Sequence, residues 1–120
     1  MKIAVPVEGS GKDTAVSASF GRAAGFLVYD DDQGTTDILN NDAAQSAGGA
    51  GIRAAQTVVD SGAKILLTPQ CGGNAAKVLL AAGVKLYKTQ PGVSASENIK
   101  RFLRGELTEL SEIHEGFHKH

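Results

Sequence analysis

The sequence has no tryptophan, and aromatic residues make up only 5% of its 120 residues. Proteins that bind single-stranded nucleic acids usually stack the bases on aromatic side chains. Basic residues (12 Lys plus Arg) and acidic residues (13 Asp plus Glu) almost cancel, and the sequence shows no basic stripe. A nucleic-acid partner is therefore not expected.

Cysteine is also scarce, because Cys71 is the only one in the chain. A single thiol cannot form an internal disulfide, and small secreted proteins usually depend on several. The sequence has no apolar run near the roughly 20 residues of a membrane-spanning helix. The apolar segment after Lys2 is too short for the core of a signal peptide. We therefore expect a cytoplasmic protein with no membrane partner.

Glycine, by contrast, is abundant, with 15 residues. Much of it falls in three clusters, at residues 9–11, 48–51 and 72–73. Such clusters between segments of regular apolar spacing predict turns or loops. A chain of this length is typical of one domain. It can bury roughly two-thirds of its unfolded surface in a single core.

Five segments have the apolar patterns of β-strands: residues 2–7, 25–31, 35–41, 63–68 and 84–89. In the first, Ile3, Val5 and Val7 lie at every second position, as in a strand with an apolar face. The second and third flank a short turn that contains Gly34, which predicts an antiparallel hairpin. The fourth is a continuous apolar run, which is typical of a strand buried on both faces of a parallel sheet.

Three segments have helical spacing: residues 50–62, 74–82 and 94–107. Gly62 and Gly83 are placed to end the first two helices. Ser94 followed by Glu97 is a capping-box pattern for the third helix, although Ser96 could also be its N-cap. The side chains expected to face the core are Ile52, Ala55, Val58, Val59, Val78, Leu79, Ala82, Ile99, Phe102 and Leu103.

The predicted elements follow one another as βββαβαβα. This order predicts a single α/β domain, with a mixed five-stranded sheet and helices on both faces. We assign the domain to residues 1–105 and a polar C-terminal tail to residues 106–120. A long loop rich in glycine and serine follows the first strand, at residues 8–25. Loops of this length in a small domain are usually functional or mobile.

Cys71 lies between the fourth strand and the second helix, where open α/β sheets commonly bind ligands. Gly72 and Gly73 would let backbone N–H groups approach a ligand closely. The helix start favours anions and lowers the pKa of a nearby thiol, which would make Cys71 a metal ligand. An equally good interpretation is a buried cysteine that acts as a small apolar side chain.

Two further patterns are weaker. Cys71 with Lys77 mimics the C-x5-R loop of cysteine phosphatases, but lysine lacks the bidentate fork of arginine, and no histidine precedes the cysteine. A nucleophilic cysteine is therefore disfavoured. His114 and His118 would share one face of a helix and, with His120, could bind a metal. A solvated tail is the simpler interpretation of these three histidines.

The other two glycine-rich segments also suit an anion. Gly49-x-Gly51-x-x-Ala54 matches a dinucleotide fingerprint, but a polar loop separates it from the preceding strand, so that assignment is not favoured. Its glycines with Arg53 remain a generic anion contact. In the long first loop, Arg22 could neutralise an anionic ligand, and Phe20 could form an apolar wall, although a solvated arginine is the usual case.

Three stretches, SASFGRAAGFLVYD, AGGAGIRAAQTVVDSGAKILLT and GGNAAKVLLAAGVKLYKT, resemble the dinitrogenase iron–molybdenum cofactor biosynthesis family. The resemblance covers about residues 1–105. It depends on the Phe-Gly-Arg after the first strand, the Gly-x-Gly helix entry and the glycine turn after the fourth strand. Many relatives have histidine where this chain has Ser19, and a glycine–proline pair in the turn around Cys71.

The resemblance implies a ribonuclease H-like α/β fold without nuclease activity. It also implies binding of anionic metal–sulfur clusters, such as the iron–molybdenum cofactor or its precursors. One member, from anaerobic bacteria, carries a molybdenum–copper sulfide cluster. Partner proteins for cluster delivery would follow from such a role, with the chain as a monomer or weak dimer.

We therefore expect a non-enzymatic carrier of a molybdenum-containing metal–sulfur cluster. A cysteine-dependent phosphatase acting through Cys71 and a cluster-free interaction module are the alternatives. The candidate metal ligand is Cys71. The residues expected to form the glycine-lined cleft are Ser19, Phe20, Gly21, Arg22, Gly49, Gly51, Arg53, Gln70, Cys71, Gly72, Gly73 and Asn74.

Overall fold

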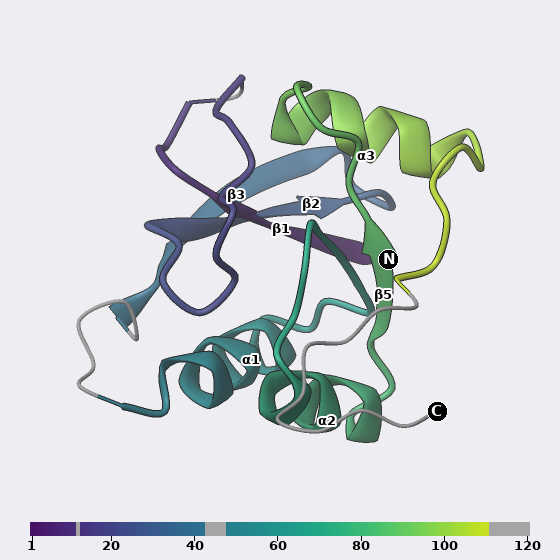
Figure 1. Cartoon of the computed structure of the whole chain (residues 1–120). Helices are drawn as coiled ribbons and strands as arrows, with labels where there is room; N and C mark the ends of the chain where they lie inside the picture. Colours follow the sequence, from purple (N-terminus) through teal and green to yellow (C-terminus); the bar gives the residue numbers. More distant parts are fainter. Residues whose placement is uncertain (12, 43–47, 111–120) are drawn as a thin grey trace.

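The computed structural model describes residues 1–11, 13–42 and 48–110, and within them it shows one five-stranded sheet (Figure 1). The sheet order is β3-β2-β1-β4-β5. Strand β1 pairs antiparallel with β2 and parallel with β4, so the sheet is mixed, as predicted. The strands are β1 (Lys2–Val7), β2 (Gly25–Asp30), β3 (Thr35–Asn40), β4 (Ile65–Thr68) and β5 (Lys85–Lys88).

In the described part of the chain, three helices cover the two faces of the sheet (Figure 1). Helices α1 (Ala50–Asp60) and α2 (Gly73–Ala81) lie side by side on one face, and α3 (Ala95–Leu103) lies on the other. Gly62 and Gly83 follow α1 and α2 with φ of 87° and 84°. These left-handed conformations favour glycine and end both helices as the sequence predicts. No helix in the described ranges is long and apolar enough to cross a membrane.

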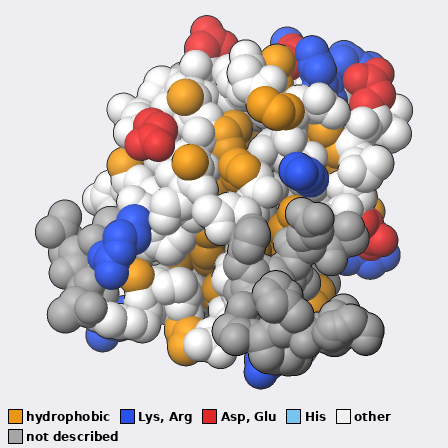
Figure 2. All heavy atoms as spheres, viewed as in Figure 1, with side chains coloured by type: hydrophobic (Ala, Val, Ile, Leu, Met, Phe, Trp, Pro, Cys, Tyr) orange, Lys and Arg blue, Asp and Glu red, His pale blue; other side chains and the backbone are white. Residues whose placement is uncertain are grey.

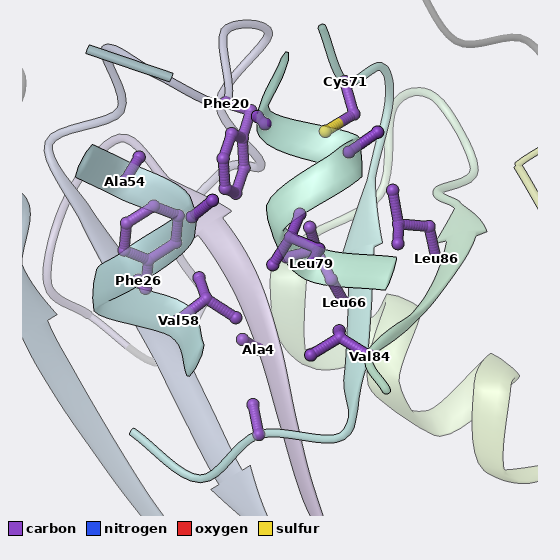
Figure 3. Close-up of a cluster of buried hydrophobic side chains, with 14 of the residues drawn as sticks. Ala4, Phe20, Phe26, Ala54, Val58, Leu66, Cys71, Leu79, Val84 and Leu86 are labelled. Carbon is purple, nitrogen blue, oxygen red and sulfur yellow. The ribbon is translucent and has the colours of Figure 1, made fainter. Parts of the chain in front are cut away.

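Strands β1 and β4 are buried on both faces. Ala4 and Leu66 pack under α1 and α2 (Figure 3), while Ile3, Val5 and Leu67 pack toward α3. The continuous apolar run of β4 therefore has the double burial that its sequence predicts. Because these two strands lie at the centre of the sheet, they fix the positions of the loops that follow them.

The apolar faces of the helices differ in detail from the prediction. Ile52 is 45% exposed, and the side of α1 that faces the core carries Ala54, Ala55 and Val58 instead. The start of α1 also lies next to α2, where a Cβ added at Gly51 would be 3.6 Å from the Cβ of Ala75, an ordinary contact distance. In α2, Ala75, Ala76 and Leu79 are buried, with Val78 and Ala82 only partly so. The predicted core residue Leu103, the last residue of α3, is 42% exposed.

Helix α3 has a side-chain cap. The Ser94 hydroxyl accepts a hydrogen bond from the backbone N–H of Glu97 (3.1 Å), so Ser94 rather than Ser96 is the N-cap. The Glu97 carboxylate pairs with Arg101 (3.2 Å), one turn along the helix.

The segment after α3 contributes to the core. Leu107 and Leu110 are buried, and this segment runs beside the outer edge of β5. Lys88 N–H donates to Thr108 O, and Leu110 N–H donates to Leu86 O, both at 2.9 Å. These residues fall in the segment that the sequence predicts to be a polar tail, and the division at residue 105 stays a prediction. The three histidines of the tail lie outside the described residues.

The pairing of β2 with β3 depends on the missing side chain of Gly25. A Cβ at this position would lie 2.5 Å from the carbonyl oxygen of Leu39, which is backbone and cannot swing away. We predict that Gly25→Ala lowers the free energy of unfolding by about 1–3 kcal/mol, the usual cost of overpacking. Gly11→Ala is the matched control, because nothing lies within 4 Å of its added Cβ. Urea denaturation measures both, and equal stability of the two variants would contradict this role for Gly25.

Candidate functional site

A cavity of about 730 Å³ lies where three segments meet: the first loop, the start of α1 and the turn from β4 into α2. This is the carboxyl end of β4, the edge at which open α/β sheets usually bind ligands. The cavity is lined by Ser19, Phe20, Gly21, Arg22, Gly49, Ala50, Gly51, Ile52, Gln70, Gly72, Gly73, Asn74, Ala75 and Lys77.

Direct contacts hold the three segments together. The backbone of Gly21 lies against the start of α1, where an added Cβ would be 3.1 Å from both N and Cα of Gly51. Gly51 in turn lies next to Ala75 of α2. Gln70 Nε2 donates to the carbonyl oxygen of Ala18 (3.0 Å), which ties the β4–α2 turn back to the first loop. These contacts join the three segments around the cavity.

Asn41 holds the first loop in place through side-chain hydrogen bonds. The sequence did not predict this role. Its amide group donates to the carbonyl oxygens of Gly21 (3.1 Å) and Ala23 (2.9 Å), and the residue is buried. Phe20 packs against Phe26 of β2, with ring centroids 5.4 Å apart (Figure 3). A single asparagine after a strand is a common turn residue, so no local pattern in the sequence marks its role.

The electrostatic character of the cavity comes largely from two helix starts. The N-caps of α1 and α2 are Gly49 and Gly72, and neither helix has a side-chain cap or an acidic residue in its first turn. The first N–H groups of both helices therefore have no intrahelical acceptor, and each helix start carries a partial positive charge. Gly49 adopts φ of 70°, which a side chain would strain.

Two cationic side chains, Arg22 and Lys77, also line the cavity. Among its described lining residues there is no aspartate, glutamate, histidine or cysteine. The arrangement offers N–H donors and positive charge, and it suits an anion. On the described part of the face shown in Figure 2, acidic and basic side chains are interspersed.

The structure brings most of the predicted site residues together. All of them line the cavity except Arg53, which is exposed on α1, and Cys71. The prediction omitted Ala50, Ile52, Ala75 and Lys77. The apolar spacing of α1 suggested that Ile52 faced the core. In the sequence, Lys77 was singled out only because Cys71 and Lys77 have a spacing like that of the C-x5-R loop of cysteine phosphatases.

Cys71 belongs to the core rather than to the cavity lining. It is fully buried, and it packs in the cluster that contains Leu66, Leu79 and Leu86 (Figure 3). Burial raises the pKa of the Cys71 thiol to about 11. The expectation that the helix start lowers this pKa is therefore wrong, because desolvation of the thiolate outweighs the helix dipole. The thiol is protonated at neutral pH.

We predict that Cys71 reacts slowly with iodoacetamide in the native protein. At pH 8 its thiolate population should be about two orders of magnitude below that of an ordinary cysteine, and burial slows access further. Mass spectrometry of samples labelled with and without urea measures the ratio. Comparable labelling rates with and without urea would show that the thiol is accessible in the folded protein.

The raised pKa of Cys71 in the folded protein also predicts a pH dependence of stability. The free energy of unfolding should fall as pH rises from 9.0 toward about 11.

Comparison with known proteins shows which family the chain belongs to. Residues 1–105 match the family model described as dinitrogenase iron-molybdenum cofactor. The apo orange protein from Desulfovibrio gigas is 39% identical with a TM-score of 0.87, and the match covers 92% of each chain. A Thermotoga protein described as a candidate NifB protein of the DUF35 family is 33% identical with a TM-score of 0.81, covering 98% of this chain and 97% of that one. No curated protein sequence matches the chain. With the family model spanning residues 1–105, the chain belongs to the dinitrogenase iron-molybdenum cofactor family.

Proposed function

We propose that the protein binds and carries an anionic, molybdenum-containing metal–sulfur cluster in the cavity of about 730 Å³, without catalysing a reaction. The observation that carries this proposal is the convergence of two uncapped helix starts with Arg22 and Lys77 on one cavity. Each helix start and each cation favours negative charge, and no acidic side chain of the described lining opposes it. The family match and the likeness to the orange protein support the same class of cargo.

The mode of binding follows from the donors that the lining offers. No described lining residue carries a thiolate or an imidazole, so the cluster must bring its own sulfide ligands. Backbone N–H groups at the starts of α1 and α2 would donate hydrogen bonds to those sulfides. Phe20, Ile52 and Ala75 would contact the polarizable, weakly hydrated sulfur surface. Cys71 would then have a structural role, in place of the metal-ligand role considered from the sequence.

The family match supports an iron–molybdenum type of cargo, and the cavity itself does not select one cluster composition. A molybdenum–copper sulfide and an iron–molybdenum-cofactor-like cluster both meet the requirement for a sulfide-bearing polyanion. The proposal includes a ribonuclease H-like fold without nuclease chemistry, as the resemblance to the family implies. A cytoplasmic location and partner proteins that receive the cluster complete the carrier role.

A cysteine phosphatase is not favoured. Such an enzyme needs an accessible thiolate beside its phosphate site, whereas Cys71 is buried and its pKa is raised to about 11. No observation specifically favours a cluster-free interaction module.

We predict that Arg22→Ala and Lys77→Gln each weaken cluster binding roughly tenfold at low ionic strength, equivalent to about 1.4 kcal/mol. The loss should shrink at high salt, because salt screens exposed charges. Lys64→Gln is the matched control. It removes the same charge just before the first residue of β4, whereas the cavity lies beyond the last residue of that strand. Apo protein is titrated with tetrathiomolybdate and copper(I), followed by visible absorption, and metals per chain are counted after desalting.

Two results would contradict the carrier proposal. Full-length protein that retains no molybdenum after desalting would rule out this cluster. Equal losses from Lys64→Gln and Arg22→Ala would show that net charge, rather than the cavity, controls binding.

A further inference from the structure

Asn41 makes three hydrogen bonds to the first loop, on both sides of Arg22. Its Nδ2 donates to the carbonyl oxygens of Gly21 (3.1 Å) and Ala23 (2.9 Å), the two residues that flank Arg22. Its backbone N–H donates to Ala24 O (3.3 Å). Asn41 is only 5% exposed, and it is not among the described residues that line the cavity. The residue therefore contacts the backbone that carries Arg22, and not the space that a cargo would occupy.

The position of Asn41 is set by the sheet. The residue directly follows Asn40, the last residue of β3, which pairs with Gly25 at the start of β2. Strand β2 in turn pairs with β1 along its whole length. Because the first loop connects β1 to β2, the base of the β2–β3 hairpin is a fixed point beside it. Hydrogen bonds from Asn41 thus place the loop relative to the sheet.

Hydrogen bonds inside the loop have a different effect. The Ser17 hydroxyl donates to Ser19 O (3.0 Å), and Arg22 N–H donates to the Ser19 hydroxyl (3.3 Å). Each of these bonds joins residues two or three positions apart. They shape the turn locally, but they cannot hold Arg22 at a given distance from the sheet, as Asn41 can.

The contribution of Arg22 to binding depends on where its backbone is held. Arg22 is exposed and lines the cavity, whereas the next residue, Ala23, is fully buried. A long exposed side chain loses less entropy on binding when its backbone is already fixed. If the Asn41 amide were removed, the carbonyl groups of Gly21 and Ala23 would lose their donors and turn toward other partners. The backbone between them would then move away from the cavity.

We propose that Asn41 is a positioning residue for cargo binding. Its amide group holds Arg22 at the cavity, and it raises the affinity for the anionic cargo through Arg22, without touching the cargo. This inference rests on the proposed function, and it assigns a role in binding to a residue outside the cavity lining.

The test is a set of double-mutant cycles. Asn41→Leu keeps the branched shape of the side chain and removes both of its donors. Asn40→Leu is the matched control, because it makes the same change at the neighbouring, exposed residue. Asn41→Ala is the second variant in case Asn41→Leu does not fold. Each is made in the wild-type, Arg22→Ala and Lys77→Gln proteins. The full-length apo proteins are titrated with tetrathiomolybdate and copper(I) at low and high salt, and visible absorption gives the dissociation constants.

Asn41→Leu should weaken binding about fivefold in the wild-type and Lys77→Gln proteins, but less than about twofold in Arg22→Ala. The loss should shrink at high salt, because it acts through an exposed charge. Asn40→Leu should leave the affinity unchanged. Equal losses in all three backgrounds, or a loss that salt does not change, would overturn the proposal. Asn41 would then affect the shape of the cavity rather than the position of Arg22.

Amide NMR spectra of the ¹⁵N-labelled apo proteins test the positioning without any cargo. Asn41→Leu should shift the amides of Gly21, Arg22 and Ala23, and Asn40→Leu should leave these three nearly unchanged. Unshifted loop amides in Asn41→Leu would overturn the proposal. Wild-type protein that retains no molybdenum would overturn the proposed function, and with it the role of Asn41 in binding. Wild-type protein that binds the cargo, with additive losses in the variants, would overturn the role of Asn41 alone.

Discussion

The close backbone contact between Gly21 and Gly51 is the constraint on which the candidate site depends. With no side chain at position 21, the first loop can lie directly on the start of α1. Gly51 and Ala75 then allow α1 to approach α2, so that two helix starts face the same cavity. Arg22 reaches this cavity because it follows Gly21 in the loop. A side chain at position 21 would press on the backbone of Gly51 and force the loop away from α1.

Helices α1 and α2 lack stabilising features at their starts, next to the cavity. α3 has a serine cap and an acidic residue in its first turn, whereas α1 and α2 have neither. A missing side-chain cap typically costs about 1 kcal/mol, and a favourable first-turn charge is worth several tenths more. These two helices therefore forgo stability at the cavity, as is common at sites shaped for a ligand. An anion bound between them would supply the acceptors and the negative charge that the sequence leaves out.

The sequence predicted those features that follow from local pattern. Alternation in β1, the apolar run of β4, and Gly62 and Gly83 each depend on a few neighbouring residues, and the structure agrees with them. The loops of the cavity were also predictable, because strand ends and glycine clusters indicate where ligands can approach. These local patterns account for the mixed sheet and for most of the cavity lining.

The misses concern residues whose environment is set by distant parts of the chain. Ile52 has helical apolar spacing, but Ala54, Ala55 and Val58 form the buried side of α1, and Ile52 lies at the cavity instead. Leu107 and Leu110 lie in a polar segment and are buried only because the edge of β5 is available to pair with. Burial of Cys71, which raises its pKa, places the thiol in the large apolar cluster that several elements of the fold build together. Asn41 holds the first loop through contacts about twenty residues away.

The central claim is that backbone N–H groups at the starts of α1 and α2 hold the cluster. The most direct measurement is the amide NMR spectrum of the ¹⁵N-labelled protein before and after loading with a diamagnetic molybdenum–copper sulfide cluster. The account predicts that the largest shifts fall on Ala50, Gly51 and Ile52 in α1 and on Gly73, Asn74 and Ala75 in α2. Shifts centred elsewhere, with these six amides unchanged, would contradict it.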